Sequence, residues 1–217
     1  MFTVKRYISN QWMSNHCRDP WVIRARQEGM RARSGFKIIQ IQKKFQIIKP
    51  DHNLLELGAA PGAWTQQLVK MLSKKSKLIA VDQANWSECR HATCLSKCDF
   101  MSEQGMQRIY TELDKLTILH GVLSDACPNI TGQQNIDYFK IAEMIEFIWK
   151  HYVNYYKQSP SQYFIFKCFD GVLPLLKCKC PQLFANADQI HKIRVESTKV
   201  HSSEVYILCE LRKSQPN

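Results

Sequence analysis

The sequence predicts an α/β fold, with one twisted, mostly parallel sheet and helices on both faces. Short apolar runs typical of buried strands alternate with longer segments of helical periodicity, which is the pattern of β-α-β units. The length of 217 residues suits one domain. No repeat or low-complexity tract interrupts the pattern, and no apolar run approaches the roughly 18 residues of a membrane span. We therefore expect a single globular domain and no insertion into a membrane.

Each element follows from its local pattern. The first helix is expected over residues 33–46, where apolar side chains recur near helical spacing and Pro50 ends the pattern. A short strand over 53–57, a glycine turn over 58–62 and a helix over 64–72 follow. The same two patterns then alternate as strand 77–81, helix 103–116, strand 117–123, helix 137–155 and strand 163–169, with two tail strands over 190–195 and 205–211.

Polar residues stand where four of these strands end. They are the turn 58–62, Asp82, Asp125 and Lys167. In a parallel sheet these ends meet at one edge, and ligands bind there, at the switch in strand order. The sequence therefore predicts a functional site at that edge.

Positive charge is concentrated in the first part of the chain. The net charge is +11, and residues 1–50 carry eleven Lys and Arg against Asp19 and Glu28 alone. Such a field attracts polyanions, so nucleic acid is the leading partner; an anionic membrane surface, or solubility alone, is the alternative. We expect RNA contacts from a basic set formed by Arg18, Arg24, Arg26, Arg31, Arg33, Lys43 and Lys44.

The nine cysteines indicate a reducing compartment, because their number is odd and no apolar signal segment precedes them. Zinc is an alternative at Cys178-Lys-Cys180 and around Cys89–Cys98. Neither group has the paired spacing of a structural zinc site, so we expect no metal. Residues 1–17 are basic and free of acids, which is typical both of a mitochondrial presequence and of a basic RNA-binding arm. We divide the rest into a basic helical extension, 18–50, and a core, 51–213, within one domain.

The turn after the first strand, Gly58-Ala-Ala-Pro-Gly-Ala-Trp64, would let the backbone pass close to a ligand. Its spacing is neither that of a dinucleotide fingerprint nor that of a phosphate-binding loop. Asp82 follows the second strand, 26 residues after Glu56, where a carboxylate can accept both ribose hydroxyls of an adenosine. The alternative for Asp82 is a helix cap or a turn residue.

Five segments together resemble the FtsJ-like (RrmJ-type) RNA 2′-O-methyltransferases. They are 58–64, Cys98-Asp-Phe100, Leu123-Ser-Asp-Ala-Cys-Pro-Asn129, Phe166-Lys167 and Ser203-Glu-Val-Tyr206, and they occur in the family's order over most of the chain. Within the family, residues 16–21 and 31–37 look most like the mitochondrial large-subunit rRNA uridine enzymes. The resemblance implies a Rossmann-like, S-adenosylmethionine-dependent methyltransferase fold, with 51–213 as the catalytic core.

The resemblance also implies roles for individual residues. The family's catalytic tetrad maps onto Lys37, Asp125, Lys167 and Glu204. S-adenosylmethionine would be contacted by Gly58, Pro61, Gly62, Ala63, Trp64, Asp82, Asp99, Phe100 and Asp125, with Asp82 at the ribose and Asp99 and Phe100 at the adenine. Lys167 ends an apolar strand, so a desolvated Lys167 could act on the proton of a ribose hydroxyl; the alternative is a rim lysine with a wet ammonium.

The expected activity is methylation of a ribose 2′-hydroxyl in ribosomal RNA, on a uridine of the mitochondrial large-subunit rRNA. The expected partner is ribosomal RNA or an assembling large subunit, and the expected state is a monomer in the mitochondrial matrix, with cytoplasm or nucleus as the alternative. Two rival functions remain: a tRNA 2′-O-methyltransferase, and a non-catalytic RNA-binding assembly factor on the same fold. The complete tetrad disfavours the second.

Overall fold

The computed structural model describes residues 18–153, 163–198 and 202–212, so the expected presequence, 1–17, lies outside the described residues. One sheet of seven strands runs through the described part in the order β3-β2-β1-β4-β5-β7-β6. The strands are β1 Leu54–Leu57, β2 Leu78–Val81, β3 Thr93–Leu95, β4 Gly121–Ser124, β5 Tyr163–Phe169, β6 Ala187–Ile193 and β7 Glu204–Leu211. The first five are parallel to one another, whereas β7 is antiparallel to both β5 and β6. The predicted mostly parallel sheet is confirmed.

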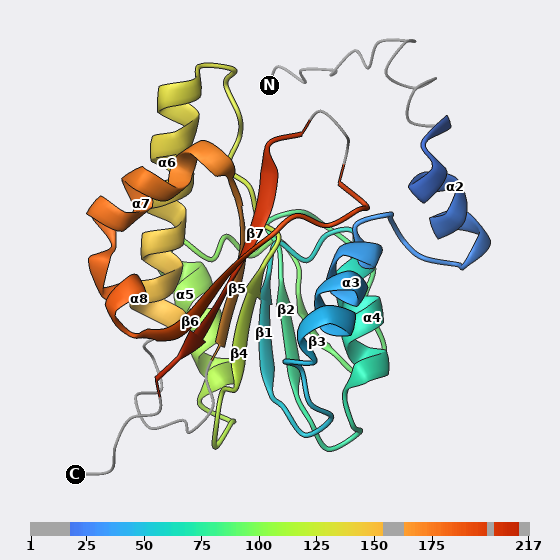
Figure 1. The fold of residues 1–217 in the computed structure, drawn as a ribbon. Helices are drawn as coiled ribbons and strands as arrows, with labels where there is room; N and C mark the ends of the chain where they lie inside the picture. The colour runs from blue at the N-terminus through green and yellow to red at the C-terminus, as the bar shows by residue number, and fades with distance from the viewer. Residues whose placement is uncertain (1–17, 154–162, 199–201, 213–217) are drawn as a thin grey trace, which may run out of the picture.

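Helices cover both faces of this sheet (Figure 1). They are α2 Pro20–Gln27, α3 Gly35–Phe45, α4 Ala63–Met71, α5 Glu103–Leu113, α6 Gln134–Ile148, α7 Leu173–Lys179 and α8 Pro181–Ala185. A π-helical turn, Trp149–Val153, continues α6, and a 3-10 turn, Asp170–Val172, precedes α7. Helices α3 and α4 pack on one face, and α5 to α8 lie on the other.

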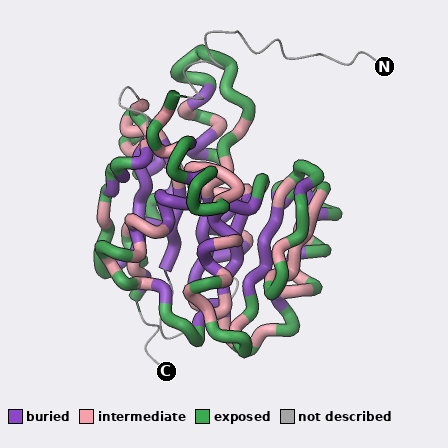
Figure 2. The backbone as a smooth tube through the Cα atoms, turned by 90° about the vertical axis from the view of Figure 1, so that its right-hand side faces the viewer, coloured by how far each residue is buried: buried purple, intermediate pink, exposed green. Residues whose placement is uncertain are grey.

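Alternation along the strands divides the core into two layers. In β1, Leu54 packs with Ile38 and Ile41 of α3, whereas Leu55 packs with Ile145 of α6. Successive side chains of a strand point to opposite faces, so strands covered on both sides are apolar at most positions, with Glu56 as the exception in β1. Figure 2 shows these buried residues along the middle of the molecule. Because α3 supplies part of this core, the basic segment 18–50 is integrated with the sheet.

Some elements differ from those expected. The third predicted strand begins at Gly121 rather than at 117, and the helix expected over 103–116 ends at Leu113. Helices α2, α7 and α8 and strand β3 were not predicted, since each is short and β3 is only half-buried. No helix in the described ranges combines the length and hydropathy needed to cross a bilayer, and no cluster of three or more His, Cys, Asp or Glu there is placed to hold a metal.

Candidate active site

Four charged side chains from distant parts of the sequence meet at the carboxyl edge of the sheet. Asp125 follows β4, and Lys167 lies near the end of β5. Glu204 begins β7, and the antiparallel register places it opposite Phe169 at the end of β5. Lys37 joins them from the first turn of α3. The structure thus brings together all four residues of the expected tetrad.

The tetrad is connected by short ion pairs. Lys167 Nζ lies 3.0 Å from Asp125 Oδ1 and also donates to the Asp125 carbonyl oxygen. Lys37 Nζ lies 2.7 Å from Glu204 Oε1 and 3.9 Å from Asp125 Oδ1. The four side chains are only 9–18% exposed, so each ion pair offsets part of the cost of removing its charges from water.

These contacts determine the charge states within the tetrad. Burial is the largest influence and disfavours the ammonium of Lys167, but the neighbouring Asp125, Cys127 and Glu204 together outweigh burial and raise the pKa of Lys167 above its usual value. Burial likewise opposes ionisation of Asp125, but Lys167 and Lys37 together lower the pKa of its carboxyl. Lys167 is therefore a charged donor at neutral pH in this state, whereas a general base must be neutral before it accepts a proton.

Tyr206 is a fifth member of the cluster, to which the sequence assigned no role. Its hydroxyl donates to Asp125 Oδ1 at 2.7 Å, and Lys37 Nζ lies 5.3 Å from the centre of its ring. Tyr206 is fully buried, and burial followed by the Asp125 charge raises the pKa of its hydroxyl well above the usual value. Tyr206 therefore stays a donor that orients Asp125.

A pocket of about 250 Å³ opens beside the tetrad. It lies between the loops that follow β1 and β4, where the strand order reverses. Its lining includes four of the expected cofactor residues, Gly58, Asp82, Asp99 and Phe100. Residues to which the sequence assigned no cofactor role complete it: Gln83, Met101, Met144, and the four residues Ala126, Cys127, Pro128 and Asn129 of the motif that follows β4.

At position 58, between the two loops, the pocket wall has room only for a residue without a side chain. Gly58 has a φ of +78°, and a Cβ there would lie 2.5 Å from the Ala126 nitrogen. Any other residue would fill the pocket wall and strain the backbone. Cys127 lines both this pocket and a small hollow that also contains Lys167, so the pocket borders the tetrad.

The two acids of the pocket are held by backbone groups. Asp82 accepts from Ala60 N–H at 2.9 Å and from Ala84 N–H at 2.7 Å, one on each carboxylate oxygen. Asp99 Oδ1 accepts from Met101 N–H at 2.9 Å. Each carboxylate oxygen can accept more than one hydrogen bond, so both acids retain capacity for a ligand. The turn role proposed as the alternative for Asp82 thus coexists with a place in the pocket.

The remaining expected cofactor residues, Pro61, Gly62, Ala63, Trp64 and Asp125, lie outside the described lining of the pocket. Trp64 is buried, packs on Tyr206 with ring centres 5.6 Å apart, and donates to the Ser34 carbonyl oxygen. Pro61, Gly62 and Ala63 form the end of the turn and the start of α4, outside the described pocket lining. Beneath the turn, Glu56 accepts from the Thr65 hydroxyl at 2.7 Å, and burial raises the pKa of its carboxyl to about 8.

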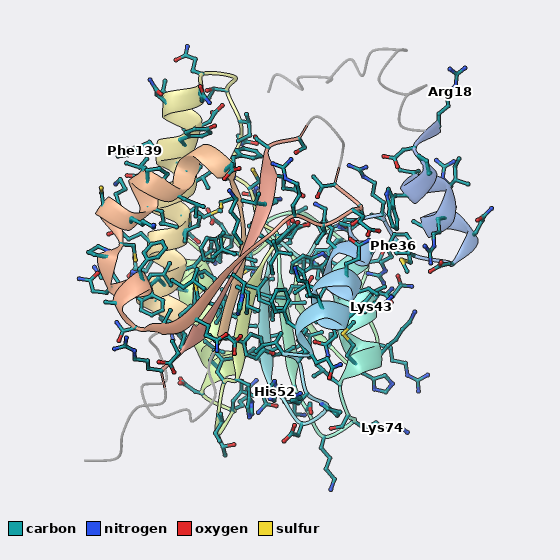
Figure 3. All side chains as sticks on the ribbon, viewed as in Figure 1. Arg18, Phe36, Lys43, His52, Lys74 and Phe139 are labelled. Atoms are coloured by element: carbon teal, nitrogen blue, oxygen red, sulfur yellow. The ribbon has the colours of Figure 1, made fainter. Side chains whose placement is uncertain are left out.

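The basic set expected to contact RNA divides into two groups. Arg24 pairs with Glu28, Arg33 pairs with Asp19, and Arg31 donates to backbone carbonyl oxygens. The other four, Arg18, Arg26, Lys43 and Lys44, are exposed. Figure 3 shows Arg18 at the outer end of α2, pointing away from the body of the molecule, and Lys43 on α3.

The chain is similar in sequence to known proteins. The sequence pattern of the FtsJ-like methyltransferase family matches residues 30–212. A ribosomal RNA large subunit methyltransferase E from Vesicomyosocius okutanii is 32% identical over 96% of this chain and 97% of its own length. The protein of the same name from Rhodospirillum rubrum is 28% identical over 95% of this chain and 77% of its own length.

A solved structure shares the fold. A protein from Plasmodium falciparum, described as a ribosomal RNA methyltransferase, superposes with a TM-score of 0.69. The match covers 85% of this chain and 100% of that one, at 19% identity. At this identity the likeness supports the fold alone.

Proposed function

This chain belongs to the FtsJ-like methyltransferase family, and we propose that it transfers a methyl group from S-adenosylmethionine to a ribose 2′-oxygen of ribosomal RNA. The observation that carries the proposal is the contact between Lys37, Asp125, Lys167 and Glu204 beside a pocket lined by Asp82 and Asp99. Relatives named as ribosomal RNA large subunit methyltransferases support the choice of RNA.

The pocket residues fit the cofactor. The glycine at 58 leaves the pocket wall clear, and Asp82 and Asp99 retain acceptor capacity. Asp82 would accept from the ribose hydroxyls, Asp99 from the adenine amino group, and Phe100 would lie beside the ring. S-adenosylmethionine supplies an electrophilic methyl group when bound. The protein's part is then to place a ribose oxygen in line with it, and alignment of this kind can contribute roughly 7–11 kcal/mol.

Lys167 is the group that would hold the ribose oxygen. An ammonium has three N–H donors, and two of them are directed at Asp125. The third can donate to the 2′-oxygen and stabilise the charge that develops on it. Because the pKa of Lys167 is raised, we assign it orientation and electrostatic stabilisation in place of the proton abstraction considered from the sequence.

The hydroxyl proton needs an acceptor other than a charged lysine. Within the described ranges, the contacts of the Asp125 carboxylate converge on Oδ1, from Lys167, Lys37 and Tyr206. We assign the proton to Oδ2: bonding of the methyl group to the oxygen makes the hydroxyl proton strongly acidic, so a carboxylate with a lowered pKa can accept it. Lys37 and Tyr206 keep the carboxylate in place, and Glu204 in turn holds Lys37.

We extend the proposal to the substrate and the compartment. The resemblance of residues 16–21 and 31–37 to mitochondrial uridine enzymes supports a uridine of the mitochondrial large-subunit rRNA, and the basic, acid-free start supports import. A fusion of residues 1–20 to a fluorescent reporter should enter mitochondria. Diffuse signal from both this fusion and the full-length protein would remove the proposed location.

The activity is tested with purified protein, labelled S-adenosylmethionine and ribosomal RNA. We expect isothermal titration to show cofactor binding, and label to enter RNA as a 2′-O-methyl group. RNA carrying 2′-deoxyuridine at the modified position should accept no label. Absence of cofactor binding would favour the non-catalytic assembly factor, and methylation of tRNA alone would favour the rival substrate.

A further inference from the structure

Arg31 joins two loops that border the pocket. Its Nη1 donates to the carbonyl oxygens of Pro61, at 3.3 Å, and Ser87, at 2.6 Å, and its Nη2 donates to that of Glu88 at 2.6 Å. Pro61 belongs to the glycine turn after β1, whereas Ser87 and Glu88 belong to the segment after β2. One guanidinium therefore connects the turn that carries Gly58 to the segment that begins with Asp82.

The packing around Arg31 depends on the absence of a side chain at Gly62. Gly62 has a φ of +96°, and a Cβ there would lie 2.3 Å from Arg31 Nη1 and 2.9 Å from Trp86 Cζ3. The Arg31 guanidinium also lies 5.9 Å from the centre of a Trp86 ring. Gly62 thus admits the guanidinium against the backbone of the turn.

The backbone of Arg31 is held as well as its side chain. Its N–H donates to Gln66 Oε1 at 3.2 Å, and Gln66 Nε2 donates to the Gly29 carbonyl oxygen at 2.9 Å. Gln66 lies in α4, which begins at the end of the glycine turn. The segment that follows α2 is therefore bound by the Arg31 side chain to the turn and by the Arg31 backbone to α4.

We propose that Arg31 is a positioning residue for the cofactor, and that its guanidinium braces the two pocket loops instead of contacting RNA phosphate. The inference rests on the proposed function, because it assumes that the pocket binds S-adenosylmethionine. Three of the five N–H donors of the guanidinium are already directed at carbonyl oxygens of these loops, so the loops fix its position and two donors remain for any other partner. Without these bonds, the loops that carry Gly58 and Asp82 would sample other arrangements before the cofactor could bind.

The test compares Arg31→Ala with Arg90→Ala, a matched control that removes an exposed arginine near the same loop. We expect Arg31→Ala to weaken S-adenosylmethionine binding roughly tenfold or more and to raise its KM. The kcat at saturating cofactor should stay within a few fold, which a general loss of fold would not allow. Amide hydrogen exchange should increase in peptides covering 58–64 and 83–90. The salt dependence of RNA binding should not change, and Arg90→Ala should leave cofactor binding and exchange unchanged.

Arg31→Lys provides a second variant, because it keeps the charge but cannot donate to several carbonyl oxygens in a fork. Arg31→Lys should weaken S-adenosylmethionine binding less than Arg31→Ala does. If the alanine variant does not fold, the lysine variant still tests whether Arg31 braces the loops. Unchanged cofactor affinity together with a salt slope reduced by about one phosphate contact would overturn the proposal. Should the unaltered protein bind no S-adenosylmethionine, the proposed function fails, while the exchange data still decide whether Arg31 braces the loops.

Discussion

The tetrad and residues 18–33 of the basic segment are both rich in charge, but their charges are used in different ways. In the tetrad, each charge comes from a different element and is buried against an opposite charge, as Lys167 is against Asp125. In the basic segment, Arg24, Arg31 and Arg33 are engaged by neighbouring groups of the same protein. A cluster of Lys and Arg in a sequence therefore does not show that all of these side chains are available to a partner. Which charges remain free is decided by the tertiary structure.

The largest effect is expected at Lys167. Lys167→Ala should reduce methyl transfer by roughly 10²–10⁴-fold, because the group that holds the ribose oxygen is lost. S-adenosylmethionine binding, measured by isothermal titration, should stay within a few fold. A comparable loss of cofactor affinity would mean that the variant disturbs the pocket, and would contradict the separation of tetrad and pocket.

The pH dependence of the unaltered enzyme distinguishes the two roles of Lys167. Its raised pKa means that it remains an ammonium from about pH 6.5 to 9. We therefore expect kcat to be nearly flat over that interval. A tenfold rise per pH unit would show that a neutral lysine is required and would restore the general-base role.

Asp82 should produce the next effect. Asp82→Ala removes an acceptor for the ribose hydroxyls, and a hydrogen bond to a charged group of about 1.5–3 kcal/mol corresponds to a roughly 10- to 150-fold weaker affinity. The rate should recover in part at high cofactor concentration, in contrast to Lys167→Ala. Asp82→Asn is the control for shape, because it retains one acceptor oxygen for the turn. A loss of kcat with unchanged KM would contradict a binding role.

A further comparison concerns His52 and His120, two stacked histidines for which burial outweighs the nearby charge of Asp51. His52 and His120 stack 4.5 Å apart at the end of the sheet opposite the tetrad, where Figure 3 shows His52. Burial, and then the neighbouring His120, lower the pKa of His52 to about 4. Between about pH 6.5 and 4 the unfolded chain therefore binds a proton at His52 that the folded protein does not bind. The contribution of neutral His52 to the free energy of unfolding is lost as the pH falls through this range.

Denaturant unfolding of the unaltered protein and His52→Gln measures that effect. At pH 7.5 we expect the glutamine variant to be less stable, and its disadvantage should shrink by roughly 2–3 kcal/mol at pH 4.5. The difference between the two proteins isolates His52 from Glu56, whose raised pKa acts in the opposite direction. A difference that is constant with pH would show that His52 titrates normally.

The smallest effect is expected from the exposed arginine Arg26, compared with the paired Arg33. Arg26→Ala should weaken RNA binding only a few fold and reduce the salt slope by about one phosphate contact. Arg33→Ala should leave that slope nearly unchanged and lower the stability, because it leaves Asp19 without its partner. Filter binding at several salt concentrations measures the salt slope, and thermal unfolding measures the stability. The reverse pattern would show that Arg33 gives up Asp19 in order to bind RNA.

The sequence predicted the parts of the structure that follow from local pattern. Strand β5 was predicted with the observed bounds, and α3, α4 and β2 to within two residues, because apolar periodicity identifies buried segments. The strand ends at Asp82, Asp125 and Lys167 meet at one edge as expected, since parallel strands require it. Glu204 was assigned to the tetrad only by resemblance, because its position at this edge depends on β7 running antiparallel to β5.

Other features depend on contacts between distant residues, which no local pattern reveals. Tyr206 reaches Asp125 across the sheet, and Arg31 reaches the loop after β2. From the sequence alone, Arg31 could not be told apart from the other arginines of the basic segment. From the sequence, Glu56 only marked the spacing to Asp82, whereas in the structure full burial raises the pKa of its carboxyl.

The central claim is that the tetrad and its pocket form the site of methyl transfer to ribosomal RNA. It is tested most directly by mapping 2′-O-methyl groups in organellar and cytosolic RNA from cells with and without the gene. We expect one uridine of the mitochondrial large-subunit rRNA to lose its methyl group in the deletion. The unaltered gene should restore that group, and Lys167→Ala should not. An unchanged methylation map, or restoration by the Lys167→Ala variant, would contradict the account.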